Sequence, residues 1–186
     1  MAEGAALLII DMQREMERRI AAGRDCVNPE APDRILRLAA AFRHAGRPVV
    51  HVRHASDQAG AALHPESPFY PPMACAEAEA GEAVFVKAGS SGFVGTGLEA
   101  HLRARGIGAL VVVGAVAGFC VNTTVRGGAD LGFAMTVVRD AVIGFDLPEA
   151  GLSARVIFDV TMAHLAADFA DLADAAEVMA RLPVLA

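Results

Sequence analysis

The sequence predicts an α/β fold of three layers, in which a six-stranded and mostly parallel sheet lies between helices. Short β-branched runs alternate with helical stretches, and most connections between them are short. Several strands are continuous apolar runs, as is typical of strands buried on both faces. At 186 residues, without a repeat or a break in composition, the chain is expected to form one domain over residues 1–186.

The first half of the chain contains three predicted strands and one helix. Ala5–Ile10 is an uninterrupted apolar run, whereas Pro32–Ala45 carries apolar residues at helical spacing. The other two strands are predicted at Pro48–Arg53 and Ala83–Lys87. The stretch 56–81 is rich in proline, alanine and glycine. A connection this long in a compact domain is usually functional, so we interpret it as a lid or an oligomer contact.

The second half continues the alternation of helices and strands. Helices are predicted at Leu98–Arg105 (capped by Thr96), Cys120–Leu131 and about Pro148–Leu172. Strands are predicted at Ala109–Val113, Met135–Arg139 and Glu177–Met179. Strand–helix–strand units with short connections make right-handed crossovers, which produce a parallel sheet covered on both faces.

Composition and charge exclude several classes of partner. The net charge is −6 and there is no basic cluster, so we expect no nucleic acid partner. No apolar run reaches the ~20 residues of a membrane span, and the N-terminus lacks the basic lead-in of a signal peptide, so no membrane partner is expected. Cys26, Cys75 and Cys120 form no disulfide or zinc-ribbon pattern, which favours free thiols in the cytoplasm.

Reactive side chains follow the predicted strands at the edge where a ligand should bind. Ligands of an open parallel sheet lie beyond the carboxyl ends of its strands. The first strand is followed by Asp11, the second by His54, and the third ends at Lys87. The fourth leads through 114–118 to Cys120, which opens a predicted helix. An acid, a base and a thiol should therefore meet at one edge of the sheet.

This convergence predicts nucleophilic catalysis by Cys120. At a helix N-terminus its thiolate would face unpaired N–H groups and the positive end of the helix dipole, and a nearby lysine would lower its pKa further. Asp11 could take the thiol proton while Lys87 keeps that carboxylate ionised. Taken singly, each residue also has a structural interpretation: Asp11 as a turn cap, Lys87 as a solvated strand end and Cys120 as a core residue.

Several motifs in order, from about Leu7 to Met179, resemble the isochorismatase-like cysteine hydrolases, a superfamily of nicotinamidases, N-carbamoylsarcosine amidases and isochorismatases. They are Asp11-Met-Gln13, Lys87, Ser91-Gly-Phe-Val-Gly-Thr96, Gly114-Ala-Val-Ala-Gly-Phe-Cys120-Val-Asn-Thr-Thr, Ala129-Asp-Leu-Gly-Phe133 and Arg139-Asp-Ala141. The resemblance implies a Rossmann-like sheet of six parallel strands.

The resemblance also implies catalytic roles. It implies a triad of Asp11, Lys87 and Cys120, and a cis peptide between Ala115 and Val116. The backbone N–H groups of Val116 and Cys120 would form the oxyanion hole. No cofactor is implied, and the family association makes a homodimer or homotetramer the expected assembly.

Substrate contacts are expected from side chains near these motifs, namely Gln13, His54, Phe93 and Phe119. Many members carry threonine where this chain has Ala117. The missing hydroxyl could alter contacts with the substrate, whereas an oxyanion hole made by the backbone would be kept.

Retention of the thiol favours one reaction within the family. Vinyl-ether cleavage of isochorismate does not require it, whereas amide hydrolysis does. The resemblance therefore favours hydrolysis of a C–N bond in a small amide, ureido or carbamoyl compound through a thioester. Two alternatives stay open: an isochorismatase-type hydrolase that cleaves a non-amide bond without covalent catalysis, and a non-catalytic protein that uses the fold as a scaffold.

A metal site is not expected. Some family amidases bind a metal through Asp-x-His after the second strand, where this chain has His51-Val-Arg-His54-Ala-Ser-Asp57. Residues three apart on a strand point to opposite faces, which separates His51 from His54. His64 in the long connection could add a ligand, but substrate or ordinary polar contacts are the favoured roles of these histidines.

Overall fold

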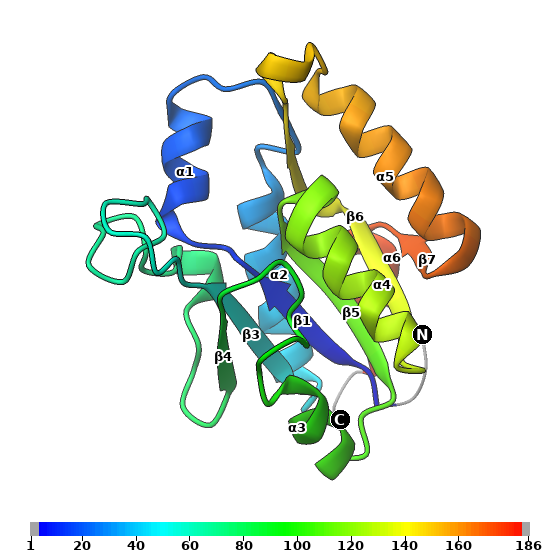
Figure 1. The fold of residues 1–186 in the computed structure, drawn as a ribbon. Helices are drawn as coiled ribbons and strands as arrows, with labels where there is room; N and C mark the ends of the chain where they lie inside the picture. The colour runs from blue at the N-terminus through cyan, green and yellow to red at the C-terminus, as the bar shows by residue number, and fades with distance from the viewer. Residues whose placement is uncertain (1–3, 184–186) are drawn as a thin grey trace.

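A parallel sheet forms the middle layer of the fold (Figure 1). This computed structural model describes residues 4–183. The strands are β1 Ala6–Ile10, β2 Cys26–Val27, β3 Val49–His54, β4 Ala83–Lys87, β5 Ala109–Ala115, β6 Ala134–Phe145 and β7 Asp171–Ala173. Six of them run parallel in the order β7-β6-β5-β1-β3-β4, and the short β2 pairs antiparallel with the far end of β6. The predicted three-layer fold with six parallel strands is confirmed, with β2 as an addition.

Helices cover both faces of this sheet. They are α1 Arg14–Ala21, α2 Ala31–His44, α3 Leu98–Ala104, α4 Asn122–Asp130, α5 Ala154–Asp168 and α6 Ala175–Ala180. Short 3-10 turns lie at Ala74–Ala76 and Pro148–Ala150, and a π-helical turn lies at Ala117–Val121. Among residues 4–183, none of the helices combines the length and the apolar character needed to cross a membrane.

The central strand β1 is buried on both faces, as its apolar run predicted. Leu7 and Ile9 belong to the apolar cluster that includes α2 and α6, whereas Leu8 and Ile10 belong to the cluster that includes α3, α4 and α5. β3 and β5 flank β1 on either side in parallel register. The residue that follows β1 therefore emerges at the centre of the carboxyl edge.

The end of the chain departs from the prediction. The expected strand Glu177–Met179 lies inside α6, because Asp174 and Glu177 form a capping box that starts this helix. The expected helix Pro148–Leu172 is shorter: it begins only after Ser153, whose side chain accepts the N–H of Val156. The last strand is β7, which pairs with β6 beside Thr136–Val138.

β6 is longer than the predicted Met135–Arg139 because it contains an irregularity. Its register against β5 shifts between Val137 and Val142. Asn28 holds this bulge by donating its side-chain amide to the carbonyl oxygens of Arg139 and Val142, each at 2.8 Å. β6 then continues to Phe145, so that its end reaches the carboxyl edge of the sheet.

Gly114 allows β1 and β5 to approach closely at this edge. It pairs with Ile10 in the sheet and has a φ of +123°, a region that side chains disfavour. A Cβ atom at Gly114 would collide with the carbonyl oxygen of Ile10. The glycine therefore sets the distance between the residue after β1 and the turn after β5.

We expect Gly114→Ala to lower the free energy of unfolding by about 3 kcal/mol or more, because both the collision and the backbone conformation are unfavourable. Chemical denaturation measures this loss. Gly108→Ala is the matched control, since Gly108 has an ordinary φ and an added Cβ atom there would meet no heavy atom within 4 Å. Equal stabilities for the two variants would contradict this account of Gly114.

Candidate active site

Asp11 follows β1 and projects its carboxylate into the centre of the carboxyl edge. Its φ of +50° lies in the left-handed region, which aspartate visits more readily than most residues. Oδ2 accepts a 2.7 Å hydrogen bond from Lys87 Nζ, whereas Oδ1 is buried without a hydrogen-bond partner among residues 4–183. Burial raises the pKa of Asp11 and the charge of Lys87 opposes that rise. One carboxylate oxygen is thus held and the other is available.

Lys87 ends β4 and its side chain is completely buried, which rules out a solvated strand end. Its ammonium lies 2.7 Å from Asp11 Oδ2, 3.2 Å from Cys120 Sγ and 3.2 Å from His54 Nδ1. It also donates to the carbonyl oxygen of Gly89 at 3.1 Å. The structure therefore brings the three predicted catalytic side chains together around one nitrogen atom.

Cys120 lies within the π-helical turn Ala117–Val121, two residues before α4 begins. The prediction that it opens an α-helix is therefore wrong in detail, although a π-helical turn is itself frequent at functional sites. Burial, reinforced by the charge of Asp11, raises the pKa of Cys120 to about 12, against the opposing effect of Lys87. This corrects the expected lowering of that pKa: the resting group is a thiol, which needs a base.

The other two cysteines have no comparable surroundings. All three cysteines are free, as predicted. Cys75 is part of the apolar core and burial raises its pKa to about 12, while burial and nearby acids raise the pKa of Cys26 to about 11. Of the three cysteines, all of which lie among the described residues, Cys120 alone accepts a hydrogen bond from a lysine.

A cavity of about 410 Å³ opens above Cys120, within the range of small-molecule sites. Predicted site residues that line it are Asp11, His54, Val116, Phe119 and Cys120, together with Ala115. The peptide between Ala115 and Val116 is cis, as the resemblance implies. The remaining lining residues were not predicted: Met16, Arg19, Arg24, Leu63, Ser90 and Leu147.

Most of these unpredicted lining residues come from segments in which the sequence predicts neither a helix nor a strand. Residues 14–27 contain α1 and β2, neither of which was predicted. A signal was available, because Glu15 precedes Arg18 and Arg19 at the spacing of helical ion pairs. Leu63 belongs to the connection 56–81, so part of that connection reaches the cavity, as a lid would.

Gln13 is buried, and its side-chain amide forms hydrogen bonds with backbone groups. It donates to the carbonyl oxygens of His54 and Tyr70 and accepts the N–H of His54. It does not line the cavity, so its place in the structure is that of a brace between the end of β3 and the connection 56–81.

The two phenylalanines have different surroundings. Phe119 is half exposed and lines the cavity, as expected of a substrate contact. Phe93 stacks on Phe133 with ring centroids 5.6 Å apart and does not line it. Ala117, where a lost hydroxyl was expected to alter substrate contacts, is fully buried in an apolar cluster away from the cavity lining.

The histidines do not assemble the metal site considered from the sequence. His51 is buried against Glu82, with 2.9 Å between Nε2 and Oε2, on the far side of β3 from His54. Donor atoms of Asp11, His54 and Cys120 do lie within 4.8 Å of one another. However, the ammonium of Lys87 contacts all three groups, so a metal ion among them would meet a positive charge. This donor set does not fit a cation.

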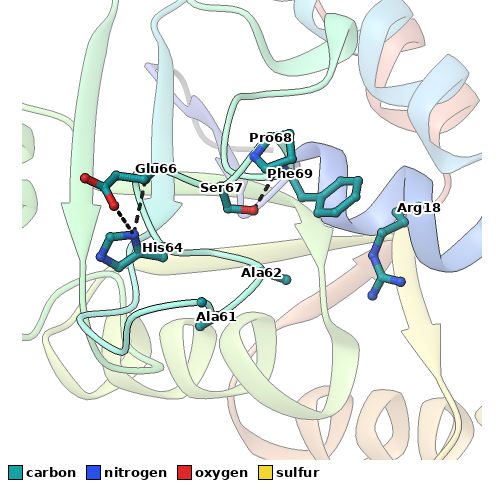
Figure 2. A pocket seen from close by; sticks show the side chains of 9 residues that line it. Arg18, Ala61, Ala62, His64, Glu66, Ser67, Pro68 and Phe69 are labelled. Atoms are coloured by element: carbon teal, nitrogen blue, oxygen red, sulfur yellow. Dashed lines mark hydrogen bonds and ion pairs between the residues drawn. The ribbon is translucent and has the colours of Figure 1, made fainter.

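His64 lies in a second cavity, formed largely within the connection 56–81 (Figure 2). Its Nδ1 faces Glu66, whose N–H it accepts at 3.3 Å. Arg18 closes this cavity with its guanidinium carbon 5.3 Å from the centroid of the Phe69 ring. The cavity contains none of the three catalytic candidates, so it is separate from the site around Cys120.

Comparison with known proteins agrees with this geometry. The isochorismatase domain matches residues 5–176. An uncharacterized isochorismatase family protein of Bacillus subtilis is 28% identical over 175 residues, which cover 92% of each chain. Streptothricin hydrolase of Streptomyces noursei is 33% identical over 179 residues, which cover 95% of this chain and 62% of that protein.

The fold agrees as well. The crystal structure of a putative hydrolase of the isochorismatase family from Chromobacterium violaceum superimposes with a TM-score of 0.90 and 31% identity, covering 97% of this chain and 94% of that one. Because the family match spans almost the whole sequence and the fold superimposes closely on that of a family member, this chain belongs to the isochorismatase family of hydrolases.

Proposed function

We propose that this hydrolase cleaves the C–N bond of a small amide, ureido or carbamoyl compound through a thioester on Cys120. The observation that carries the proposal is the position of the Lys87 ammonium, 2.7 Å from Asp11 Oδ2 and 3.2 Å from Cys120 Sγ, because Asp11 and Cys120 both line a substrate-sized cavity. A base, a nucleophile and a fixed positive charge are the components of covalent catalysis.

In the first half-reaction, Cys120 Sγ attacks the carbonyl carbon while its proton passes to the carboxylate of Asp11. A base is needed because burial keeps the sulfur protonated, with a pKa of about 12. Asp11 Oδ1 has no other hydrogen-bond partner among residues 4–183, so it is available to accept the proton. The tetrahedral oxyanion would be stabilised by the N–H groups of Val116 and Cys120.

Collapse of the tetrahedral intermediate breaks the C–N bond. Asp11 returns its proton to the leaving nitrogen, which departs as ammonia or an amine and leaves the thioester. In the second half-reaction Asp11 takes a proton from water, whose oxygen attacks the thioester carbon, and the carboxyl product leaves as Cys120 regains its proton. Lys87 keeps its proton throughout and orients the Asp11 carboxylate.

Streptothricin hydrolase, a relative at 33% identity, is named as a hydrolase. Its name supports a hydrolytic role for the shared site. The covalent step rests on the geometry around Cys120, whereas the C–N bond rests on the retained thiol, which the family resemblance associates with amide hydrolysis.

Cys120→Ala is expected to reduce turnover by roughly 1,000-fold or more, because the nucleophile is lost. The assay is ammonia release from a panel that includes nicotinamide, ureido acids and N-carbamoyl compounds. Mass spectrometry of acid-quenched wild-type enzyme should show an acyl adduct on Cys120.

Cys26→Ala is the matched control, since it removes a free thiol that does not line the cavity, and it should leave turnover unchanged. Full activity in Cys120→Ala without an adduct would favour the non-covalent hydrolase. Absence of turnover throughout the panel, together with absence of an acyl adduct on Cys120 in the wild type, would favour the scaffold.

Asp11→Asn should move hydrolysis and thiol reactivity in opposite directions. Loss of the base lowers kcat by roughly 100- to 10,000-fold. Loss of its negative charge, with Lys87 retained, lowers the pKa of Cys120, so iodoacetamide should alkylate the variant faster at pH 8. In the wild type, alkylation should rise about tenfold per pH unit to at least pH 10, as a thiol with a pKa near 12 requires.

Peptide mass spectrometry gives the rate at Cys120 separately from the other thiols. Slower alkylation of Asp11→Asn than of the wild type would contradict the assigned electrostatic role of Asp11, whatever happens to hydrolysis.

We also propose a cytoplasmic homodimer or homotetramer. Free thiols fit a reducing compartment. The exposed side chains of Val156 and Val160 lie one turn apart on α5, and Ile157 of the same helix packs toward the π-helical turn that carries Cys120. An apolar surface of this kind suits contact with a second copy.

Light scattering should therefore give two or four times the 19.3 kDa chain mass, and Val160→Glu should shift the protein toward the monomer. Val84→Glu places the same charge on the exposed edge strand β4 and serves as the control. A monomeric wild type would contradict the proposed assembly.

A further inference from the structure

Two arginines form part of the wall of the catalytic cavity, and the proposed reaction gives neither of them a role. Arg19 belongs to α1, and Arg24 lies between α1 and β2. This part of the chain passes over the carboxyl edge toward the end of β6 (Figure 1). The two side chains are 29% and 34% exposed, so both are largely shielded while remaining accessible.

Neighbouring groups hold both guanidinium groups in place. Arg19 donates from Nε to Glu15 Oε1 at 2.7 Å. Arg24 donates from Nε to Asp146 Oδ1 at 2.7 Å and from Nη2 to the carbonyl oxygen of the same residue at 2.8 Å. Each guanidinium carbon also lies 5.6 Å from the centroid of the Phe145 ring.

These contacts leave donors unused. Within residues 4–183, Arg19 hydrogen-bonds only through Nε, and Arg24 keeps Nη1 without a partner. A guanidinium that is already held in place, and that still has free terminal N–H groups, can bind a ligand carboxylate while losing little further conformational entropy.

The charges around the cavity do not balance. Asp11 offsets Lys87, and Asp146 offsets Arg24. Glu15, however, is a single carboxylate shared by two arginines, because Arg18 also donates to it from Nε and Nη2. One positive charge is therefore left over beside Arg19.

His54 does not change this count near neutral pH. Burial, followed by the charge of Lys87, lowers the pKa of His54, so its ring is neutral. The excess charge at the cavity wall is therefore that of one cation, which suits a ligand carrying one negative charge.

We propose that Arg19 and Arg24 bind a carboxylate of the substrate, so that this enzyme selects small amide or ureido compounds that carry one carboxylate. The inference rests on the proposed function for the bond that is cleaved. The binding site itself rests on the two arginines. Met16, Leu63 and Leu147 line the same cavity and would contact the hydrocarbon between the carboxylate and the scissile bond.

Binding can be measured without turnover in Cys120→Ala. The probes are N-carbamoyl derivatives of glycine, alanine and β-alanine, each compared by calorimetry with its neutral carboxamide. We expect at least one acid to bind roughly 10- to 100-fold more tightly than its carboxamide, as a charge-assisted hydrogen bond allows. If no acid binds more tightly than its carboxamide, the proposal is overturned.

Arg19→Gln in the same background should abolish the preference for the acid. Folding should be kept, because Glu15 retains the two hydrogen bonds from Arg18. Arg18→Gln is the matched control: it removes the same charge from the same carboxylate, but Arg18 lines the other cavity (Figure 2), so the free N–H groups of Arg19 remain and the preference should fall by less than in Arg19→Gln. An equal loss in both variants, or none in Arg19→Gln, would overturn the assignment.

Turnover by the wild type separates this inference from the function on which it rests. Thiol-dependent ammonia release at equal kcat/KM from acids and carboxamides overturns the carboxylate site and leaves the reaction standing. Preferential binding of acids that are never hydrolysed overturns the reaction and leaves the site standing.

Discussion

The buried ion pair between Lys87 and Asp11 is the constraint on which the rest of the site depends. Two charges withdrawn from water are tolerated only when they are paired and hydrogen-bonded, and removal of either one leaves the other uncompensated. The pair joins strands that are not neighbours, because β3 lies between β1 and β4. Lys87 therefore reaches across the end of β3, where His54 Nδ1 accepts one of its hydrogen bonds.

This arrangement ties the chemistry to the sheet itself. The end of β1 is placed by Gly114, whose missing side chain lets β5 come close, and the turn after β5 carries Cys120 to the same ammonium. The sulfur thus meets a neutral pair in which Asp11 opposes its ionisation and Lys87 favours it. Because burial adds to the effect of Asp11, the proton stays on sulfur until a substrate arrives.

The grouping of the candidate catalytic residues could be predicted from the sequence because it follows from the order of the strands along the chain. Apolar runs locate the strands, and parallel strands bring their carboxyl ends to one edge, so Asp11, Lys87 and Cys120 could be grouped without coordinates. The pKa of the thiol could not be predicted in the same way. It is set by burial, which depends on how the connection 56–81 and α1 pack over the site, and no local sequence pattern gives that packing.

The short elements near the end of the chain could not be predicted, for a related reason. β7 has three residues and is a strand only because β6 offers it a partner, whereas the predicted strand Glu177–Met179 belongs to a helix that a local capping box starts. Periodicity needs more residues than either segment provides. The same holds for Ser90 and Leu147, which line the cavity through the path of a turn rather than through any repeating pattern.

The proposed reaction and the proposed selectivity consequently depend on different parts of the molecule. The reacting groups come from strand ends and a helical turn that are fixed by the core. The charged wall comes from α1 and the segment that follows it, which can change in sequence without disturbing the sheet. The catalytic pair is electrically neutral, so it exerts little preference for the charge of a substrate. In the proposed reaction, selection among small amides then comes from that wall, where one carboxylate, Glu15, pairs with two arginines and leaves a positive charge unmatched.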